Sequence, residues 1–246
     1  GIMPHVGLWM DVEMLPPDYS LTPFAPYSDH SFVFTTRGCP NRCGFCAVKT
    51  TEPELFVNSR WKEHISLKLP KVMVHDNNIT AAGFNHFKEV MDFLAAIKKP
   101  VTFDNGFDCR KFTELHCRLL SKIKINSIRF AFDSMAQEGY IQRAILMCGK
   151  HGIKASKIMV YVLFNYKDTI ENALYRAREI AKLGAKPYAM QYVPLDSLTF
   201  SKHYNKYWNK ELCEEFFYFI NILGFANAMP FEEWRAKWKK KRFKEA

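Results

Sequence analysis

The sequence predicts an α/β fold, a partial (β/α)6 barrel of the TIM type with parallel strands. Short runs of apolar, β-branched or aromatic residues recur about every 30 residues, and most are separated by stretches with helical periodicity. Strands that alternate with helices form βαβ units, and such units build a parallel sheet. Six units are two fewer than a complete eight-fold barrel has, so we expect an open barrel.

The six predicted strands are residues 31–37, 71–76, 101–104, 127–133, 157–163 and 185–193. Helical periodicity follows the second strand in GFNHFKEVMDFLAAIKK, the third in KFTELHCRLLSKI and the fifth in DTIENALYRAREIAKLG. For the last of these helices we expect Asp168 as the N-cap, with Glu171 three residues later, and Gly184 as the C-terminal stop.

The fourth predicted strand indicates which side chains line the barrel interior. Ile128, Phe130 and Phe132 alternate with more polar or smaller residues, and we expect this apolar set to pack against the helices. Arg129, Ala131 and Asp133 then point inward. An inward Arg and an inward Asp require a polar ligand or each other.

Polar residues follow most of the strands. Asp76, Asn77 and Asn78 follow the second strand, the sequence DNGFDCR follows the third, and Asp133 and Ser134 follow the fourth. In parallel α/β folds the carboxyl ends of the strands form the ligand-binding face. The loop after the first strand opens on the same face, and it is rich in cysteine.

Composition sets the broad class. The chain has 246 residues, of which 48% are hydrophobic and 24% charged, as expected for a globular protein. It has no run of about 18 uncharged apolar residues, so we expect a soluble cytoplasmic protein without a membrane partner. Four cysteines occur singly, which predicts buried thiols in a reducing compartment and not a disulfide framework: Cys109, Cys117, Cys148 and Cys213.

The other three cysteines lie in TTRGCPNRCGFCAVKT, residues 35–50, as Cys39, Cys43 and Cys46 with the spacing C-x3-C-x2-C. A zinc site needs a fourth ligand from a distant residue such as His30, His64 or His75. A redox dithiol accounts for the last two cysteines only. A [4Fe-4S] cluster uses all three thiolates and leaves one iron free to bind a substrate or cofactor, which favours the cluster.

This motif, in the loop after the first strand of a six-unit barrel, resembles the radical S-adenosylmethionine (radical SAM) superfamily, and the resemblance covers residues 31–193. It implies that Cys39, Cys43 and Cys46 bind a single [4Fe-4S] cluster whose open iron binds S-adenosylmethionine. One electron then splits the sulfonium, and a 5′-deoxyadenosyl radical abstracts hydrogen from a substrate. An electron donor such as flavodoxin or ferredoxin is implied as a partner.

The resemblance also implies cofactor-binding positions. Phe45 corresponds to an aromatic residue beside the adenine. The family's Gly-Gly-Glu-like turn, which holds the methionine amino group, is replaced here by HDNN, so that role passes to residues 76–78. Asp133 or Ser134 is expected to bind the ribose, and Arg129 is expected to bind the methionine carboxylate. Tyr192 and the fifth strand are expected to form the wall beside the adenine.

The same residues also have purely structural interpretations. Residues 76–78 can cap the next helix, and Asp133 can simply pair with Arg129. Tyr192 can be a core aromatic residue, and His75 is expected to be a packed or solvent-edge histidine. The rival to an enzyme is a non-catalytic iron–sulfur or zinc module that acts as a redox sensor or scaffold.

Two segments flank the predicted barrel, an N-terminal extension of residues 1–30 and a C-terminal extension of residues 194–246. LPPDYSLTPF, residues 15–24, is similar to the linker that follows a cobalamin-binding domain in some radical SAM proteins. About 30 residues cannot form such a domain, so we do not expect cobalamin to be bound by this chain alone.

The C-terminal extension is basic. The net charge of the chain is +10, and the last sixteen residues contain seven Lys or Arg and three Glu. Trp234, Trp238 and Phe243 lie among these bases, a composition compatible with nucleic acid or another anionic substrate. The alternative is a helix that docks Phe231, Trp234 and Trp238 on the domain, since these residues share the i, i+3, i+7 spacing.

Overall fold

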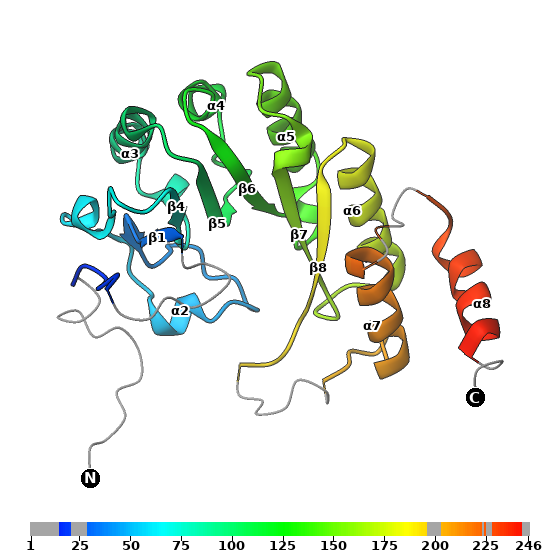
Figure 1. Ribbon diagram of the computed structural model, residues 1–246. Helices are drawn as coiled ribbons and strands as arrows, with labels where there is room; N and C mark the ends of the chain where they lie inside the picture. Colours follow the sequence, from blue (N-terminus) through cyan, green and yellow to red (C-terminus); the bar gives the residue numbers. More distant parts are fainter. Residues whose placement is uncertain (1–14, 21–28, 196–202, 223, 225–227, 243–246) are drawn as a thin grey trace, which may run out of the picture.

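The computed structural model describes residues 15–20, 29–195, 203–222, 224 and 228–242. Its centre is a six-stranded sheet in the order β1-β4-β5-β6-β7-β8, with every neighbouring pair parallel (Figure 1). The strands are β1 (His30–Val33), β4 (Lys71–Val74), β5 (Val101–Phe107), β6 (Ile125–Ala131), β7 (Ile158–Phe164) and β8 (Lys186–Gln191). The predicted α/β fold, a partial TIM-like barrel, is confirmed.

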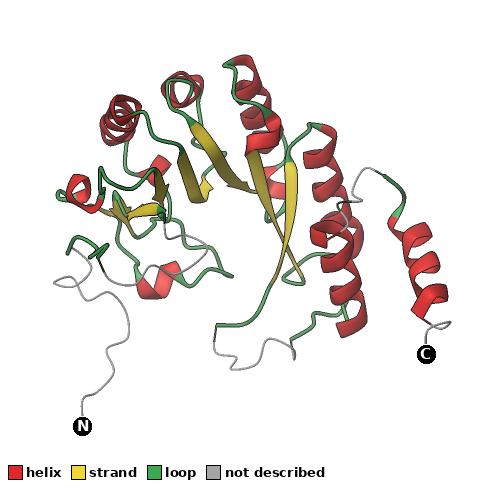
Figure 2. Cartoon of the chain, in the orientation of Figure 1, coloured by secondary structure: helices red, strands yellow, loops and turns green. Residues whose placement is uncertain are grey.

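The helices follow the strands and cover the convex side of the curved sheet (Figure 2). The α-helices are α2 (Val48–Thr51), α3 (Phe84–Ile97), α4 (Glu114–Leu120), α5 (Tyr140–Lys150), α6 (Ile170–Lys182), α7 (Lys210–Phe217) and α8 (Phe231–Arg242). Helix α7 continues into a π-helical turn, Tyr218–Ile222. Short 3₁₀ helices are Trp61–His64, Ile79–Ala81, Met135–Gln137 and Ala155–Lys157.

The first predicted strand, 31–37, is divided in two. Strand β1 belongs to the barrel, whereas β2 (Thr36–Arg37) leaves it and pairs antiparallel with β3 (Phe56–Val57). This small two-stranded sheet brackets residues 38–55, the loop that carries the three cysteines. The loop therefore begins and ends at adjacent points of the backbone.

The core lies between the sheet and the helices. Ile128, Phe130 and Phe132 are completely buried there, while Arg129, Ala131 and Asp133 retain some exposure, as the alternation predicts. Phe130 packs against Phe107 and Phe112 with ring centroids 5.7 and 5.0 Å apart. Full burial of each such side chain contributes about 2–3 kcal/mol, so these contacts secure the strands that carry the interior residues.

The start of α6 differs from the prediction. Thr169, not Asp168, is the N-cap, and its side chain accepts a hydrogen bond from the N–H of Asn172. Asp168 instead forms an ion pair with Arg176, which is fully buried. The buried guanidinium of Arg176 needs a counter-charge, which Asp168 provides. Asp168 is not needed as the N-cap, because the neighbouring Thr169 caps the helix. The predicted stop is confirmed, since Gly184 follows the helix with a φ of 77°.

Helix α8 packs on the π-helical turn through its aromatic residues, which confirms the docking interpretation. Phe231 and Trp234 are buried, and Trp234 lies 5.2 Å from Phe219 between ring centroids. Trp238 packs on Tyr218 at 4.7 Å. These contacts use part of the aromatic surface that stacking on a base would need. Residues 243–246, which include Phe243, lie outside the described residues, as do the side chains of residues 239–242.

Within the described ranges, none of the helices is long and apolar enough to cross a membrane.

Candidate functional site

A pocket of about 170 Å³ lies at the carboxyl ends of the strands, where the sequence predicts it. The cysteine loop contributes Cys39, Asn41, Cys43, Phe45 and Cys46. The segments that follow β4, β5 and β6 contribute most of the polar residues, and the lining there is Asn77, Asn78, Asp108, Arg110, Asp133 and Gln137. Gly106, Phe107, Ala131 and Tyr161 complete the wall.

The three cysteines are half-buried free thiols on one loop. A turn in which the N–H of Cys46 donates to the carbonyl of Cys43, at 3.1 Å, brings these two close together. Burial, with a smaller effect of Cys46, raises the pKa of Cys43. Between them, Gly44 packs against Tyr166, whose hydroxyl would lie 2.2 Å from an added Cβ, so a larger residue would displace the loop.

The donor set suits an iron–sulfur cluster, and none of the three histidines considered as a zinc ligand joins it. Three soft sulfur ligands surround one pocket, and none of His30, His64 and His75 lines it. His30 contacts Asp29 and His75 contacts Asp104 instead. Among the residues that the structure describes, no three His, Cys, Asp or Glu side chains converge closely enough to hold a metal ion. The fit therefore depends on the shared loop and pocket of the three thiols.

Glu52 joins the two ends of the cysteine loop, and no pattern in the sequence pointed to it. Its carboxylate accepts two hydrogen bonds from Arg37, at 2.9 and 3.1 Å, and one from the N–H of Gly38 at 3.1 Å. A fourth comes from the amide of Asn77 at 2.7 Å. One mostly buried carboxylate thus holds the loop and orients a pocket residue from another strand.

Asp76 is turned away from the pocket. Its carboxylate accepts hydrogen bonds from the N–H groups of Thr35 and Thr36, at 2.5 and 2.9 Å, and from the hydroxyl of Thr35. His86 contacts the same hydroxyl at 3.0 Å. Burial raises the pKa of Asp76 to about 6 despite these bonds. Asp76 therefore holds the link from β1 to β2, whereas Asn77 and Asn78 line the pocket.

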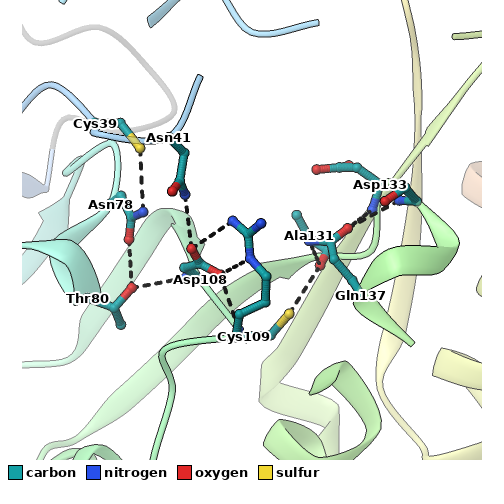
Figure 3. A network of polar contacts seen from close by, with 11 residues as sticks. Cys39, Asn41, Asn78, Thr80, Asp108, Cys109, Ala131, Asp133 and Gln137 are labelled. Atoms are coloured by element: carbon teal, nitrogen blue, oxygen red, sulfur yellow. Dashed lines mark hydrogen bonds and ion pairs between the residues drawn. The ribbon is translucent and has the colours of Figure 1, made fainter. Parts of the chain in front are cut away.

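Asn78 and Asp108 organise the polar wall of the pocket (Figure 3). Asn78 donates to the Sγ of Cys39 at 3.5 Å and accepts from Thr80 at 2.6 Å. Asp108 accepts a two-pronged contact from Arg110, at 2.8 Å for both bonds, and a third bond from Asn41 at 2.9 Å. Burial acts to raise the pKa of Asp108, but these hydrogen bonds hold it below the ordinary value.

Asp133 lines the pocket, and it is held by the turn that follows β6. Gln137 Oε1 accepts from the N–H groups of Asp133 and Ser134, at 2.6 and 3.2 Å. Burial raises the pKa of the Asp133 carboxyl to about 6. Among the contacts of the described residues, Arg129 pairs with Asp104 and not with Asp133, so the prediction that Asp133 simply pairs with Arg129 is wrong.

The remaining predicted residues are dispersed. Arg129 contacts Asp104 and does not line the pocket, and Ser134 is likewise outside the lining. Tyr192 packs on Tyr166 at 4.7 Å, and Tyr166 in turn packs on Phe45 at 5.5 Å. The structure thus brings together Cys39, Cys43, Cys46, Phe45, Asn77, Asn78 and Asp133.

Sequence reasoning missed Asn41, Glu52, Asp108, Arg110 and Gln137. The polar run DNGFDCR after the third strand was the signal for Asp108 and Arg110, although it did not single them out. The four isolated cysteines are buried free thiols, as predicted. They contribute nothing to the pocket lining.

Comparison with known proteins supports the fold and not more. No family model matches the chain, and no curated protein does. Two solved structures of the radical S-adenosylmethionine methyltransferase TsrM from Kitasatospora setae are similar. The structure with cobalamin and a [4Fe-4S] cluster bound has a TM-score of 0.56 at 14% identity, over 65% of this chain and 36% of TsrM.

The TsrM structure with tryptophan substrate and the analog aza-SAM gives a TM-score of 0.54 at 14% identity, over 67% of this chain and 35% of TsrM. This chain therefore spans about a third of TsrM. At this identity the likeness establishes a shared partial barrel.

Proposed function

We propose that this chain is a radical SAM enzyme that binds a [4Fe-4S] cluster through Cys39, Cys43 and Cys46. One observation carries the proposal: three thiols on the loop after β1 line one pocket with polar side chains from the ends of β4, β5 and β6. A cluster held by these three thiolates would leave one iron without a protein ligand, and S-adenosylmethionine would bind there. The barrel shared with TsrM supports the same function.

The pocket residues have chemistry suited to S-adenosylmethionine. The side-chain carbonyls of Asn77 and Asn78 can accept from an amino group, and the Asp133 carboxylate can accept from ribose hydroxyls. We assign the methionine carboxylate to Arg110, because Arg110 lines the pocket with a side chain that is 44% exposed, whereas Arg129 is outside the lining. The aromatic row that begins at Phe45 provides a surface for the adenine.

When bound, the cluster supplies the electron that splits S-adenosylmethionine into methionine and a 5′-deoxyadenosyl radical, which takes hydrogen from the substrate. The protein's own contribution is to hold the loop through Glu52 and to orient Asn77 and Asn78. An electron donor of the flavodoxin or ferredoxin type is the partner this chemistry requires. The excess positive charge of the chain favours an anionic substrate.

The test is anaerobic reconstitution with iron and sulfide, followed by dithionite and S-adenosylmethionine. We expect 5′-deoxyadenosine and methionine, and a change in the EPR spectrum of the reduced cluster when S-adenosylmethionine is added. The matched control replaces Cys39, Cys43 and Cys46 together by Ala. Formation of S-adenosylhomocysteine instead would indicate methyl transfer, the activity named for TsrM. Zinc without iron, or no cleavage, would favour the redox sensor or scaffold.

A further inference from the structure

A second polar cluster, Asp104 and Arg129, lies inside the barrel next to the cysteine-lined pocket. Asp104 on β5 and Arg129 on β6 each precede a pocket residue, Gly106 or Ala131, by two positions. Arg129 and Ala131 share the inward face of β6, and Arg129 lies opposite the pocket residue Gly106 on β5, so the pair lies beside the pocket. Tyr161 on β7 connects the pair to the pocket, because it lines the pocket and contacts Arg129 at 2.9 Å.

The bonds of Arg129 leave one edge of its guanidinium unused. Nη1 makes every hydrogen bond of this side chain, to the carbonyl and carboxylate of Asp104 and to the hydroxyl of Tyr161. Nε is buried without a hydrogen-bond partner, and in the described part of the chain no bond reaches Nη2. A buried donor without a partner is unfavourable, so an acceptor placed at this edge would relieve that cost.

The unused edge has the geometry of a carboxylate site. The N–H groups on Nε and Nη2 are parallel, and they match the two oxygens of a carboxylate. The Arg129 and Asp104 side chains are 19% and 25% exposed, so the pair is partly open on the interior face. We propose that Arg129 binds the carboxylate of a small organic acid, which is the substrate positioned beside the pocket.

The net charge of the Arg129–Asp104 pair is zero, which favours an anion with a single charge. Arg129 is already neutralised by Asp104, and burial together with Arg129 lowers the pKa of the neighbouring His75. A single carboxylate adds one negative charge to this neutral group. A phosphate dianion would add two charges beside the Asp104 carboxylate, which is a larger electrostatic cost.

Aromatic side chains near Asp104 and Arg129 favour an acid whose remaining part is apolar. Tyr161 and Tyr188 meet edge to face with centroids 5.9 Å apart, and Phe32 stacks on His75 at 5.5 Å. The Arg129 guanidinium itself lies over the Tyr161 ring, 5.8 Å from its centroid. Tyr161 and Tyr188 lie on the adjacent strands β7 and β8, and flat rings contact a planar or aliphatic group well.

This inference rests on the proposed function only in naming the acid as the substrate, and binding tests it separately. The probe is phenylacetate, with phenylacetamide as its neutral isostere, titrated by NMR against the full metal-free chain. We expect the acid to bind about 10-fold more tightly than the amide, since charge-assisted bonds are the stronger ones. Arg129→Gln should abolish this preference.

Two further variants keep the test decisive. Arg129→Lys retains the ion pair with Asp104 but lacks the two-pronged edge, so it should fold and still lose most of the preference. Arg143→Gln, at an exposed position on α5, should leave it unchanged. Equal binding of acid and amide by the wild type, or a preference that survives in Arg129→Lys, would overturn the assignment. Acid binding without cleavage of S-adenosylmethionine would refute only the proposed function.

Discussion

Replacing Glu52 by Ala removes the carboxylate that holds the cysteine loop closed. It accepts four hydrogen bonds, and the side chains of Glu52 and Arg37 are only 15% and 10% exposed. Breaking a buried ion pair from one side costs about 3–5 kcal/mol, because the remaining charge is left uncompensated. With partial exposure we expect a loss of about 3 kcal/mol, which lowers Tm by roughly 6–12 °C for a chain of this size.

The assay is urea unfolding of the metal-free chain, combined with hydrogen–deuterium exchange over residues 38–52. Exchange in this loop should accelerate in Glu52→Ala, because the N–H of Gly38 loses its acceptor. Glu54→Ala is the matched control, since Glu54 lies on the same loop with an exposed side chain. A loss below 1 kcal/mol with unchanged exchange would refute the view that Glu52 closes the loop.

Three other predictions follow from the site and the tail. Alanine at Cys39, Cys43 or Cys46 should abolish iron binding on reconstitution, whereas alanine at any of the four buried cysteines should not. Retention of about four irons per chain by a variant of the cysteine loop would contradict this. Because its folded pKa is raised to about 6, the contribution of Asp76 to stability is present below about pH 4 and is lost as pH rises through 6. The wild-type unfolding free energy should therefore fall by about 3 kcal/mol relative to Asp76→Asn between pH 4 and 7, and a constant difference in urea unfolding would disprove it. The association constant for an oligonucleotide should fall about tenfold per tenfold increase in salt concentration for each phosphate contact, and charge reversal of the basic residues in 237–244 should remove most of this dependence. Undetectable binding at low salt would mean that α8 is a docking helix only.

Local patterns were enough to predict the architecture and the position of the cysteine loop. Alternation along 127–133 correctly placed Ile128 and Phe130 in the core and Asp133 inside the barrel, because the two faces of a strand differ in polarity. The position of the three cysteines directly after the first strand placed their loop at the carboxyl ends of the strands. Both inferences use residues close together in the chain, where periodicity and spacing carry the information.

The partners of the polar groups were decided by tertiary structure alone. Asn41 and Asp108 are 67 residues apart, Thr35 and Asp76 are 41 apart, and neither pair leaves a pattern in the sequence. Sequence assigned Asp76 to the cofactor, but the departure of β2 from the barrel brings two backbone N–H groups to its carboxylate. Periodicity tells which face of an element is buried, whereas the path of the loops decides which charge meets which donor.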